Sequence, residues 1–229
     1  MAVERAKIDV EERDEGVAIT LLSGDTGNYL GVEELAQLTS VLDQAEQSGK
    51  RWVLVRQQGR DFCLGRAPGG GGPDTRQALI GFVQRWQSLE LMTVATADGG
   101  CVGFGVGVFA LADISLASEG TWFQFPEILG NGSYPAIVAS WLFDRVPYKQ
   151  ALYWTVTGAK FTAADACQFG LASMVVPATG LAGRADEIVA GLEAVSAKAL
   201  RDGKSAAQAM SAAPRDLAVR RSMALKWFL

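Results

Sequence analysis

The sequence predicts an α/β fold built around a single core, and three observations support this prediction. Short apolar segments typical of strands alternate with helical patterns over roughly the first 180 residues, and only helical patterns follow. Hydrophobic residues make up 49% of the 229 residues and charged residues 20%, a composition typical of soluble globular chains. No internal repeat or polar linker divides the chain. We therefore expect residues 1–180 to form the core and residues 181–229 a C-terminal helical segment.

Six short apolar runs are predicted to be strands. The clearest is Trp52-Val53-Leu54-Val55, because an uninterrupted apolar run is typical of a strand covered on both faces. Prolines 126 and 177 end two other runs, since proline lacks the N–H that a sheet requires. The remaining predicted strands are residues 17–22, 92–97, 113–117, 122–125 and 171–176.

Five segments before residue 181 show helical periodicity. In residues 32–47, leucines recur at helical spacing and acidic side chains occupy other positions on the cylinder. Thr162 is a good N-cap for residues 162–169, because its hydroxyl can accept a hydrogen bond from the first turn. The other predicted helices are residues 75–89, 135–144 and 148–156.

The lack of histidine in the sequence restricts the possible chemistry more than any other feature. It excludes catalysis by Ser-His-Asp or Cys-His groups, the HExxH zinc proteases and histidine-based metal sites. The net charge of −4 argues against nucleic acid or an anionic membrane as a partner. Any reaction must therefore depend on carboxylates, backbone N–H groups, hydroxyls, lysines or a bound cofactor.

The three cysteines, Cys63, Cys101 and Cys167, are far apart in the sequence. They lack the spacing of a disulfide framework or a zinc site, so we expect small buried thiols in a reducing compartment and no bound metal. Cys63 as a nucleophile is the alternative, but no histidine could activate it and its apolar neighbours would raise its pKa. The charged N-terminus and the lack of a long apolar run indicate a cytoplasmic protein without a membrane span.

Two glycine-containing turns follow predicted strands. Residues 103–107 do not match a dinucleotide-binding fingerprint, whose third glycine comes one position later and which lies early in a βαβ unit. They are typical of a helix start with free N–H groups, or of glycines that only let a helix pack closely on a sheet. Residues 62–67 form a similar turn, and the two turns together could hold an oxyanion with their N–H groups.

Four motifs, in order and with matching spacing, resemble those of the crotonase superfamily, also called the enoyl-CoA hydratase/isomerase superfamily. The resemblance runs from about residue 10 to residue 219. It implies a crotonase-like fold, a spiral of ββα units that form two nearly perpendicular sheets, with C-terminal helices. The motifs are residues 59–66 (similar to GxxFCAGxD), 99–113 (NGxxxGGGxxLxxxCD), 122–128 (FxxPE) and 157–177 (TG…sAxEAxxxGLVxxVVP).

The resemblance also implies the ligand, the assembly and the site residues. Members bind an acyl thioester of coenzyme A, so coenzyme A is expected as part of the substrate and no separate cofactor is expected. Residues 181–229 are expected to help build a homotrimer or homohexamer. The family holds the thioester oxygen with two backbone N–H groups, which the motifs place on Arg66 and Phe104, and its catalytic glutamate falls on Glu127. The implied substrate-binding residues are Leu64, Gly65, Arg66, Ala67, Gly103, Phe104 and Gly130.

Glu127 is also singled out by its surroundings. It follows an aromatic run, and an apolar environment would raise its pKa and suit it to transfer a proton near neutral pH. The alternative is an ordinary surface glutamate in a turn. Hydratases that grip a water between two glutamates carry the other one at the position of Gly107, so this arrangement is not available here.

The predicted function is therefore an acyl-CoA-processing lyase or isomerase of the enoyl-CoA hydratase/isomerase type, with an oxyanion hole and a single glutamate as acid and base. The resemblance leaves double-bond isomerisation, hydration with lyase action and ring hydrolysis open as reactions. Residues 148–158 resemble the corresponding helix of hydroxycinnamoyl-CoA hydratase-lyases. The alternative is a CoA-binding or assembly protein without catalysis. Residues 198–229 carry seven bases and two acids, which we interpret as a solvated helical face. The alternative is an anion contact by Lys198, Lys204, Arg220 or Arg221.

Overall fold

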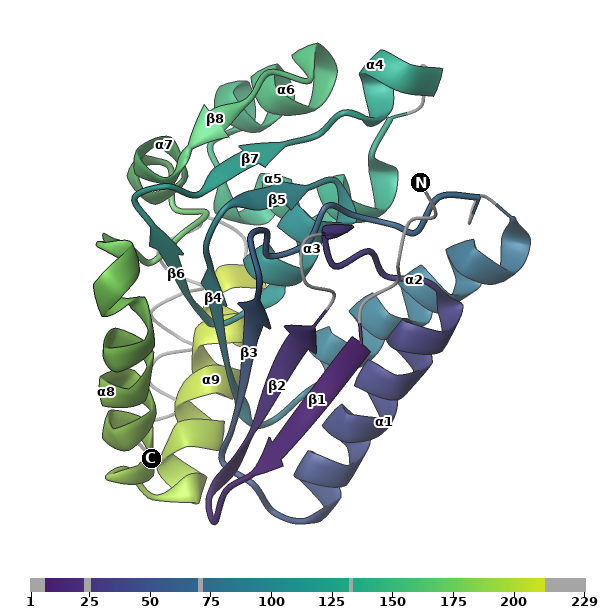
Figure 1. The fold of residues 1–229 in the computed structure, drawn as a ribbon. Coiled ribbons are helices and arrows are strands. Elements are labelled where there is room, and N and C mark those ends of the chain that lie inside the picture. Colours follow the sequence, from purple (N-terminus) through teal and green to yellow (C-terminus); the bar gives the residue numbers. More distant parts are fainter. Residues whose placement is uncertain (1–6, 23–25, 70–71, 132–133, 213–229) are drawn as a thin grey trace.

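A computed structural model describes residues 7–22, 26–69, 72–131 and 134–212 (Figure 1). A large sheet has the strand order β1-β2-β3-β4-β6-β9, and a small sheet has the order β5-β7-β8. In the large sheet only the β1–β2 pair is antiparallel. The strands are β1 Lys7–Glu12, β2 Gly16–Leu22, β3 Trp52–Gln58, β4 Met92–Ala97, β5 Gly100–Val102, β6 Ile114–Ser118, β7 Trp122–Gln124, β8 Phe161–Thr162 and β9 Met174–Val176.

Helices cover both faces of the large sheet, with α1 and α2 on one side and α8 and α9 on the other (Figure 1). Alternate residues of β2 supply the two faces. Ile19 belongs to the apolar core that includes α1, α2 and α3, whereas Ala18 packs with α8. The helices are α1 Val32–Gln47, α2 Pro73–Gln87, α3 Phe104–Leu111, α4 Glu127–Asn131, α5 Ala136–Arg145, α6 Tyr148–Thr157, α7 Ala163–Gln168, the 3₁₀ turn η2 Ala178–Gly180, α8 Leu181–Glu193 and α9 Ala197–Ala212.

Most predicted elements are present, and the differences have local causes. The predicted bounds of α1 and β4 are confirmed, as is the N-cap of α7, where the Thr162 hydroxyl accepts the Asp165 N–H at 3.1 Å. The prediction of a strand over residues 171–176 is wrong in its first half. The N–H groups of Leu171 and Ala172 both donate to the Ala166 carbonyl, which closes a turn after α7 instead of joining the sheet.

The C-terminal helices form part of the core. Leu181 and Val189 of α8 are buried against the sheet. On α9 the predicted solvated face is wrong for Lys204, whose ammonium is buried and lies 2.8 Å from both the Leu91 carbonyl and an Asp113 carboxylate oxygen. Lys198 is exposed, and residues 213–229, with the two predicted arginines, lie outside the described part of the chain. Oligomerisation through residues 181–229 stays a prediction.

Within the ranges that the structure describes, no helix is both long and apolar enough to cross a bilayer.

Candidate active site

A cavity of about 520 Å³ collects the residues that the two predicted turns and the aromatic strand contribute. Its volume falls within the range typical of small-molecule sites. A larger cavity of about 910 Å³ lies beside α9; Lys204 lines it, but none of the residues predicted to bind or process the thioester is among its described lining residues. The smaller cavity is lined by Leu64, Gly65, Arg66, Arg76, Leu79, Val102, Gly103, Phe104, Pro126, Glu127, Tyr134, Pro135, Ala136, Ile137 and Val138.

The backbone N–H of Arg66 points away from Leu30, the residue with which Arg66 pairs. Leu30 forms an isolated parallel bridge with Arg66, in which the Leu30 N–H donates to Gly65 at 3.0 Å and the Ala67 N–H donates to Leu30 at 2.8 Å. In a parallel pairing of this kind, the central residue directs its own N–H to the opposite side. The Arg66 N–H has no acceptor among the described residues and is available to a ligand.

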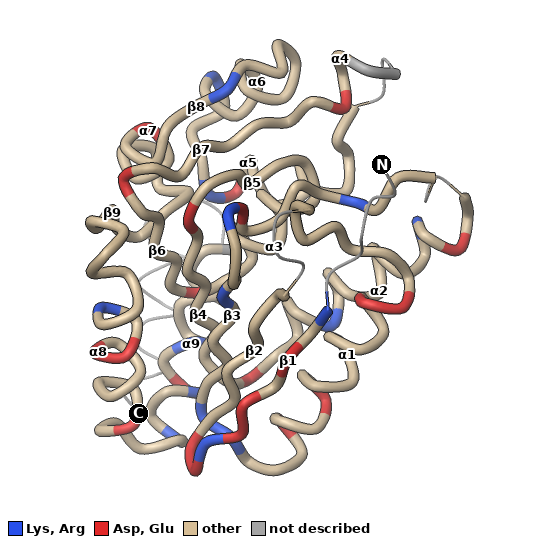
Figure 2. Tube along the Cα trace, viewed as in Figure 1, with Lys and Arg blue, Asp and Glu red and all other residues tan. Residues whose placement is uncertain are grey.

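The backbone N–H of Phe104 is the first donor of α3. The first four N–H groups of a helix have no intrahelical acceptor, and they lie at the positive end of the helix dipole. Gly103 is the N-cap residue, with φ of +53° and ψ of −116°, a conformation that favours glycine. α3 carries no charged residue and is tan throughout in Figure 2, so the dipole of its N-terminus is not offset within the helix.

Gly65 sets the spacing between the two amides. Its φ is +107°, in the region that favours glycine. A Cβ atom at this position would lie 3.0 Å from the Val102 carbonyl oxygen and 3.8 Å from the Phe104 amide nitrogen. The segment that carries the Arg66 amide therefore lies directly against the start of α3, and a side chain at position 65 would push the two apart.

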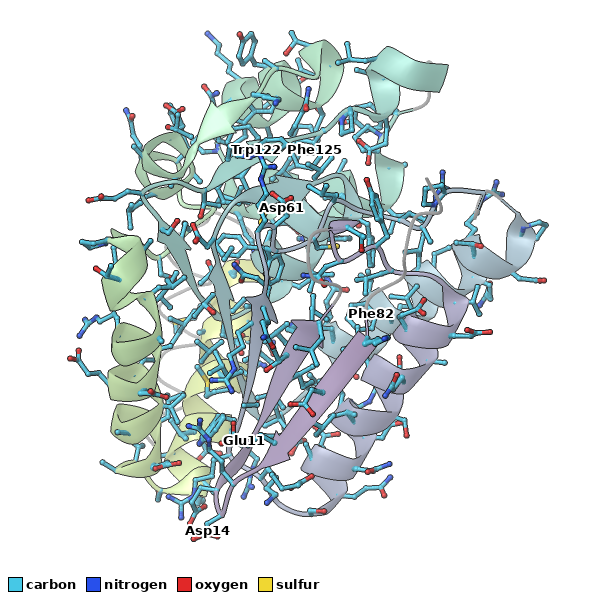
Figure 3. All side chains as sticks on the ribbon, in the orientation of Figure 1. Glu11, Asp14, Asp61, Phe82, Trp122 and Phe125 are labelled. Atoms are coloured by element: carbon cyan, nitrogen blue, oxygen red, sulfur yellow. The ribbon has the colours of Figure 1, made fainter. Side chains whose placement is uncertain are left out.

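Backbone hydrogen bonds join this segment to β5. The Cys63 N–H donates to the Gly100 carbonyl at 3.1 Å, and the Val102 N–H donates to the Cys63 carbonyl at 2.9 Å. An Asp61 carboxylate oxygen accepts the Gly100 N–H at 2.7 Å. Asp61 lies below Trp122 of the small sheet (Figure 3), and both side chains border Gly100. These bonds fix the position of one amide relative to the other without any contribution from the Arg66 or Phe104 side chains.

Glu127 is the first residue of α4 and points toward the N-cap of α3. A Cβ atom on Gly103 would lie 2.5 Å from the Glu127 Oε1 atom, so only glycine leaves room for the carboxylate. The Oε2 atom is buried and has no hydrogen-bond partner among the described residues. Burial raises the pKa of Glu127, while a hydrogen bond from its own backbone N–H and the charge of Arg66 oppose part of the rise. The raised pKa makes the Glu127 carboxylate a stronger base, which suits it to accept a proton and return it.

The structure brings together most, but not all, of the predicted substrate-binding residues. Ala67 is buried, uses its N–H for the bridge to Leu30 and does not line the cavity. Gly130 lies in α4, and its role in binding stays a prediction. Arg76 also lines the cavity and was not predicted. Arg76 lies one turn into α2, where nothing in the local pattern distinguishes a cavity residue from a solvated one.

Two of the three predicted buried cysteines, Cys63 and Cys101, are buried, whereas Cys167 is half-buried. Cys63 is fully buried, and this burial raises its pKa to about 12. Cys101 is also buried, and its burial together with the neighbouring Cys63 and Asp61 raises its pKa well above the ordinary value. The prediction of a small buried thiol is confirmed for Cys63, and its burial argues against the alternative of an attacking thiol. Over the described ranges, no three Cys, Asp or Glu side chains lie close enough to hold a metal ion.

Gly107 lies in the fourth position of α3 and faces a tryptophan. A Cβ atom there would lie 3.0 Å from Trp141 Cζ2 and 3.3 Å from Val138 Cγ2. The Trp141 ring is fully buried, and its indole N–H has no acceptor among the described residues. Indole and valine side chains therefore occupy the space into which a longer side chain at this position would extend.

Gly107→Ala is expected to lower the free energy of unfolding by about 1 kcal/mol, because overpacking against the indole outweighs the better helix propensity of alanine. In the Trp141→Phe background, where the Cζ2 atom is removed, the same substitution is expected to be less destabilising. Chemical denaturation of the four proteins of this double-mutant cycle measures the coupling. Equal losses in both backgrounds would contradict the packing argument.

Comparisons with known sequences identify the family of this chain. Residues 82–226 match the sequence profile of the family described as "Enoyl-CoA hydratase/isomerase". The chain is 29% identical over 196 residues to 3-hydroxyisobutyryl-CoA hydrolase 1 of Arabidopsis thaliana, covering 79% of this chain and 52% of that protein. It is 28% identical over 180 residues to human chromodomain Y-like protein 2, covering 72% of this chain and 35% of that protein. The chain thus spans about half or less of these relatives.

Solved structures show the same fold. An enoyl-CoA hydratase subunit from Geobacillus kaustophilus superimposes with a TM-score of 0.87 at 24% identity, covering 98% of this chain and 89% of that one. Enoyl-CoA hydratase from Bacillus anthracis also gives a TM-score of 0.87, at 23% identity and with 96% and 89% covered. The predicted crotonase-like α/β fold is confirmed. With more than half of the chain matched by its profile, this protein belongs to the enoyl-CoA hydratase/isomerase family.

Proposed function

We propose that the protein is an enzyme that forms the enolate of an acyl-CoA thioester and moves a proton on its acyl group. The Glu127 carboxylate takes the proton from the α-carbon, and the C–H electron pair becomes the C=C bond of the enolate. Negative charge develops on the thioester oxygen, where the N–H groups of Arg66 and Phe104 donate hydrogen bonds to it. Protonated Glu127 returns the proton to the α-carbon or, in a 3-enoyl-CoA, to the γ-carbon, so that the C=C bond moves from the β,γ to the α,β position.

One observation carries this proposal. The cavity holds a buried carboxylate oxygen without a partner next to two main-chain amides without acceptors, as far as the described residues extend. A buried, unpartnered polar group is costly to the fold unless a ligand uses it. Water addition by two carboxylates would need a second carboxylate at the position of Gly107, where Trp141 and Val138 occupy the space. Isomerisation by a single carboxylate is therefore favoured.

Hydrogen–deuterium exchange at the α-carbon tests the proposal without knowledge of the natural acyl group. Butyryl-CoA and a panel of medium-chain, cyclic and aromatic thioesters are incubated with the protein in D₂O, and proton NMR follows the α-proton signal. We expect at least one thioester to lose this signal faster than in buffer alone. The Cys63→Ala variant is expected to retain the exchange.

Thioester hydrolysis is the second candidate, because the Arabidopsis relative is named as a CoA-thioester hydrolase. Here Glu127 would take a proton from the water that attacks the thioester carbonyl, and the same two amides would hold the oxygen. Release of free thiol, measured with a thiol reagent in the same incubations, distinguishes this reaction from exchange. Calorimetric binding of thioesters with neither exchange nor thiol release would contradict both reactions and favour a CoA-binding protein without catalysis.

A further inference from the structure

Two arginines line the cavity together with Glu127. Arg66 follows the turn that carries the first amide, and Arg76 lies near the start of α2. Both side chains are exposed at the cavity. Glu127 is the one acidic side chain among the described lining residues, so the cavity carries more positive than negative side chains.

These two cavity arginines, Arg66 and Arg76, are unpaired in a protein whose other arginines often are paired. Neither side chain forms an ion pair or hydrogen bond with a described residue. Elsewhere, arginines in the β1–β2 turn, in and just before β3, and on α2 and α8 contact carboxylates at 3.4 Å or less, as Arg85 does with Glu46 at 2.7 Å. The paired arginines are Arg13, Arg51, Arg56, Arg85 and Arg184. A guanidinium prefers a planar anion that accepts two parallel hydrogen bonds, and a carboxylate is such an anion.

The position of Arg66 indicates which part of a thioester its side chain meets. In the proposed function the backbone N–H of Arg66 binds the thioester oxygen, so its guanidinium lies within one side-chain length of the reacting group. Its charge acts on Glu127, which places it close to the proton-transfer site as well. The phosphates of coenzyme A are separated from the sulfur by the whole pantetheine arm, and are therefore poor candidates for this side chain.

We propose that the cavity selects acyl-CoA thioesters whose acyl group carries a second, free carboxylate, and that Arg66 and Arg76 bind this carboxylate. This inference rests on the proposed function, because that function orients the acyl group in the cavity. It names the substrate class as monothioesters of dicarboxylic acids. The arginines act by charge-assisted hydrogen bonds, so the preference should weaken as salt screens the charges.

The test compares thioesters that match in length and differ in the free carboxylate. Calorimetry measures the affinities of glutaryl- and pentanoyl-pantetheine, which lack the phosphates of coenzyme A. We expect wild type to prefer the glutaryl ester by about tenfold or more, and Arg66→Gln and Arg76→Gln each to lower this ratio. Arg66→Lys should restore part of it. The control Arg60→Gln removes the same charge from an exposed residue that does not line the cavity, and should leave the ratio unchanged.

Two outcomes would overturn the inference. One is a wild-type protein that binds both pantetheine esters equally. The other is found when the same arginine variants are measured with glutaryl-CoA and pentanoyl-CoA. If they lose equal affinity for these two CoA esters and none for the pantetheine esters, the arginines bind phosphates. The Glu127→Gln variant separates this inference from the proposed function. We expect this variant to lose α-proton exchange, which tests the proposed function, and to keep the preference for the glutaryl ester, which tests the inference. Either expectation can fail without the other.

Discussion

Phe104→Pro is expected to slow exchange of the thioester α-proton about 10²–10³-fold relative to Phe104→Ala, because it deletes one of the two proposed donors to the developing oxyanion. Proline has no N–H but is well tolerated at the first position of a helix, which Phe104 occupies in α3. The φ of +53° and ψ of −116° at Gly103 are the mirror image of the extended backbone that residues before proline prefer. Glycine has no Cβ atom and adopts this conformation readily, so a proline can follow it.

Alanine is the matched control because it also removes the phenyl ring but keeps the N–H. The ring is buried and lies 6.0 Å, centroid to centroid, from Phe82, so both variants lose the same aromatic contact. Exchange is followed by proton NMR in D₂O, and thermal unfolding by circular dichroism shows whether both variants fold. Equal exchange rates in two folded variants would contradict the role of this amide.

Glu127→Gln is expected to lower the exchange rate about 10³-fold and, at the same time, to stabilise the protein at neutral pH. The folded state raises the pKa of Glu127 by burial, so between the unfolded and the folded pKa values the native state binds more protons than the unfolded state. Stability therefore falls as pH rises through this window, because the buried group must ionise. Glutamine has no charge to bury and avoids this loss.

Thermal unfolding between pH 4 and 8 measures the effect. The midpoint of Glu127→Gln should exceed that of wild type near pH 7, and the difference should shrink below about pH 4, where the carboxyl is protonated in both states. Glu119→Gln serves as control, since Glu119 is exposed and lines no part of the cavity. In wild type, the exchange rate should rise with pH through the raised pKa, because the base acts as the carboxylate. A variant no more stable than wild type at pH 7 would contradict the burial argument.

The elements that sequence reasoning identified are those with continuous apolar runs or strong periodicity. β3 lies between two strands with both faces covered, so its apolar run is long enough to recognise. β1 was missed because it is the edge strand and alternates charged with apolar residues. β5 has three residues beginning with Gly100, and β8 has two; both depend on pairing with β7, which no local pattern encodes.

The site also combines features that the local sequence predicts with features that depend on contacts between distant segments. The free N–H groups of the helix start at Phe104 follow from local chemistry, and so does the tendency of an apolar environment to raise the pKa of Glu127. That Gly65 lies against the start of α3 depends on contacts between segments some forty residues apart, for which only the resemblance to a family gave an indication. The inward position of Arg76 had no signal of either kind.

Because the two proposed oxyanion donors belong to the main chain, any residue except proline can supply them. Positions 66 and 104 are then open to substitution, and a change there alters which acyl groups fit while the chemical step is retained. Single replacements at these two positions can therefore change which acyl groups fit. In this chain the positions carry a bulky guanidinium and a phenyl ring. Searches that look for fixed side chains would overlook relatives that have taken this route.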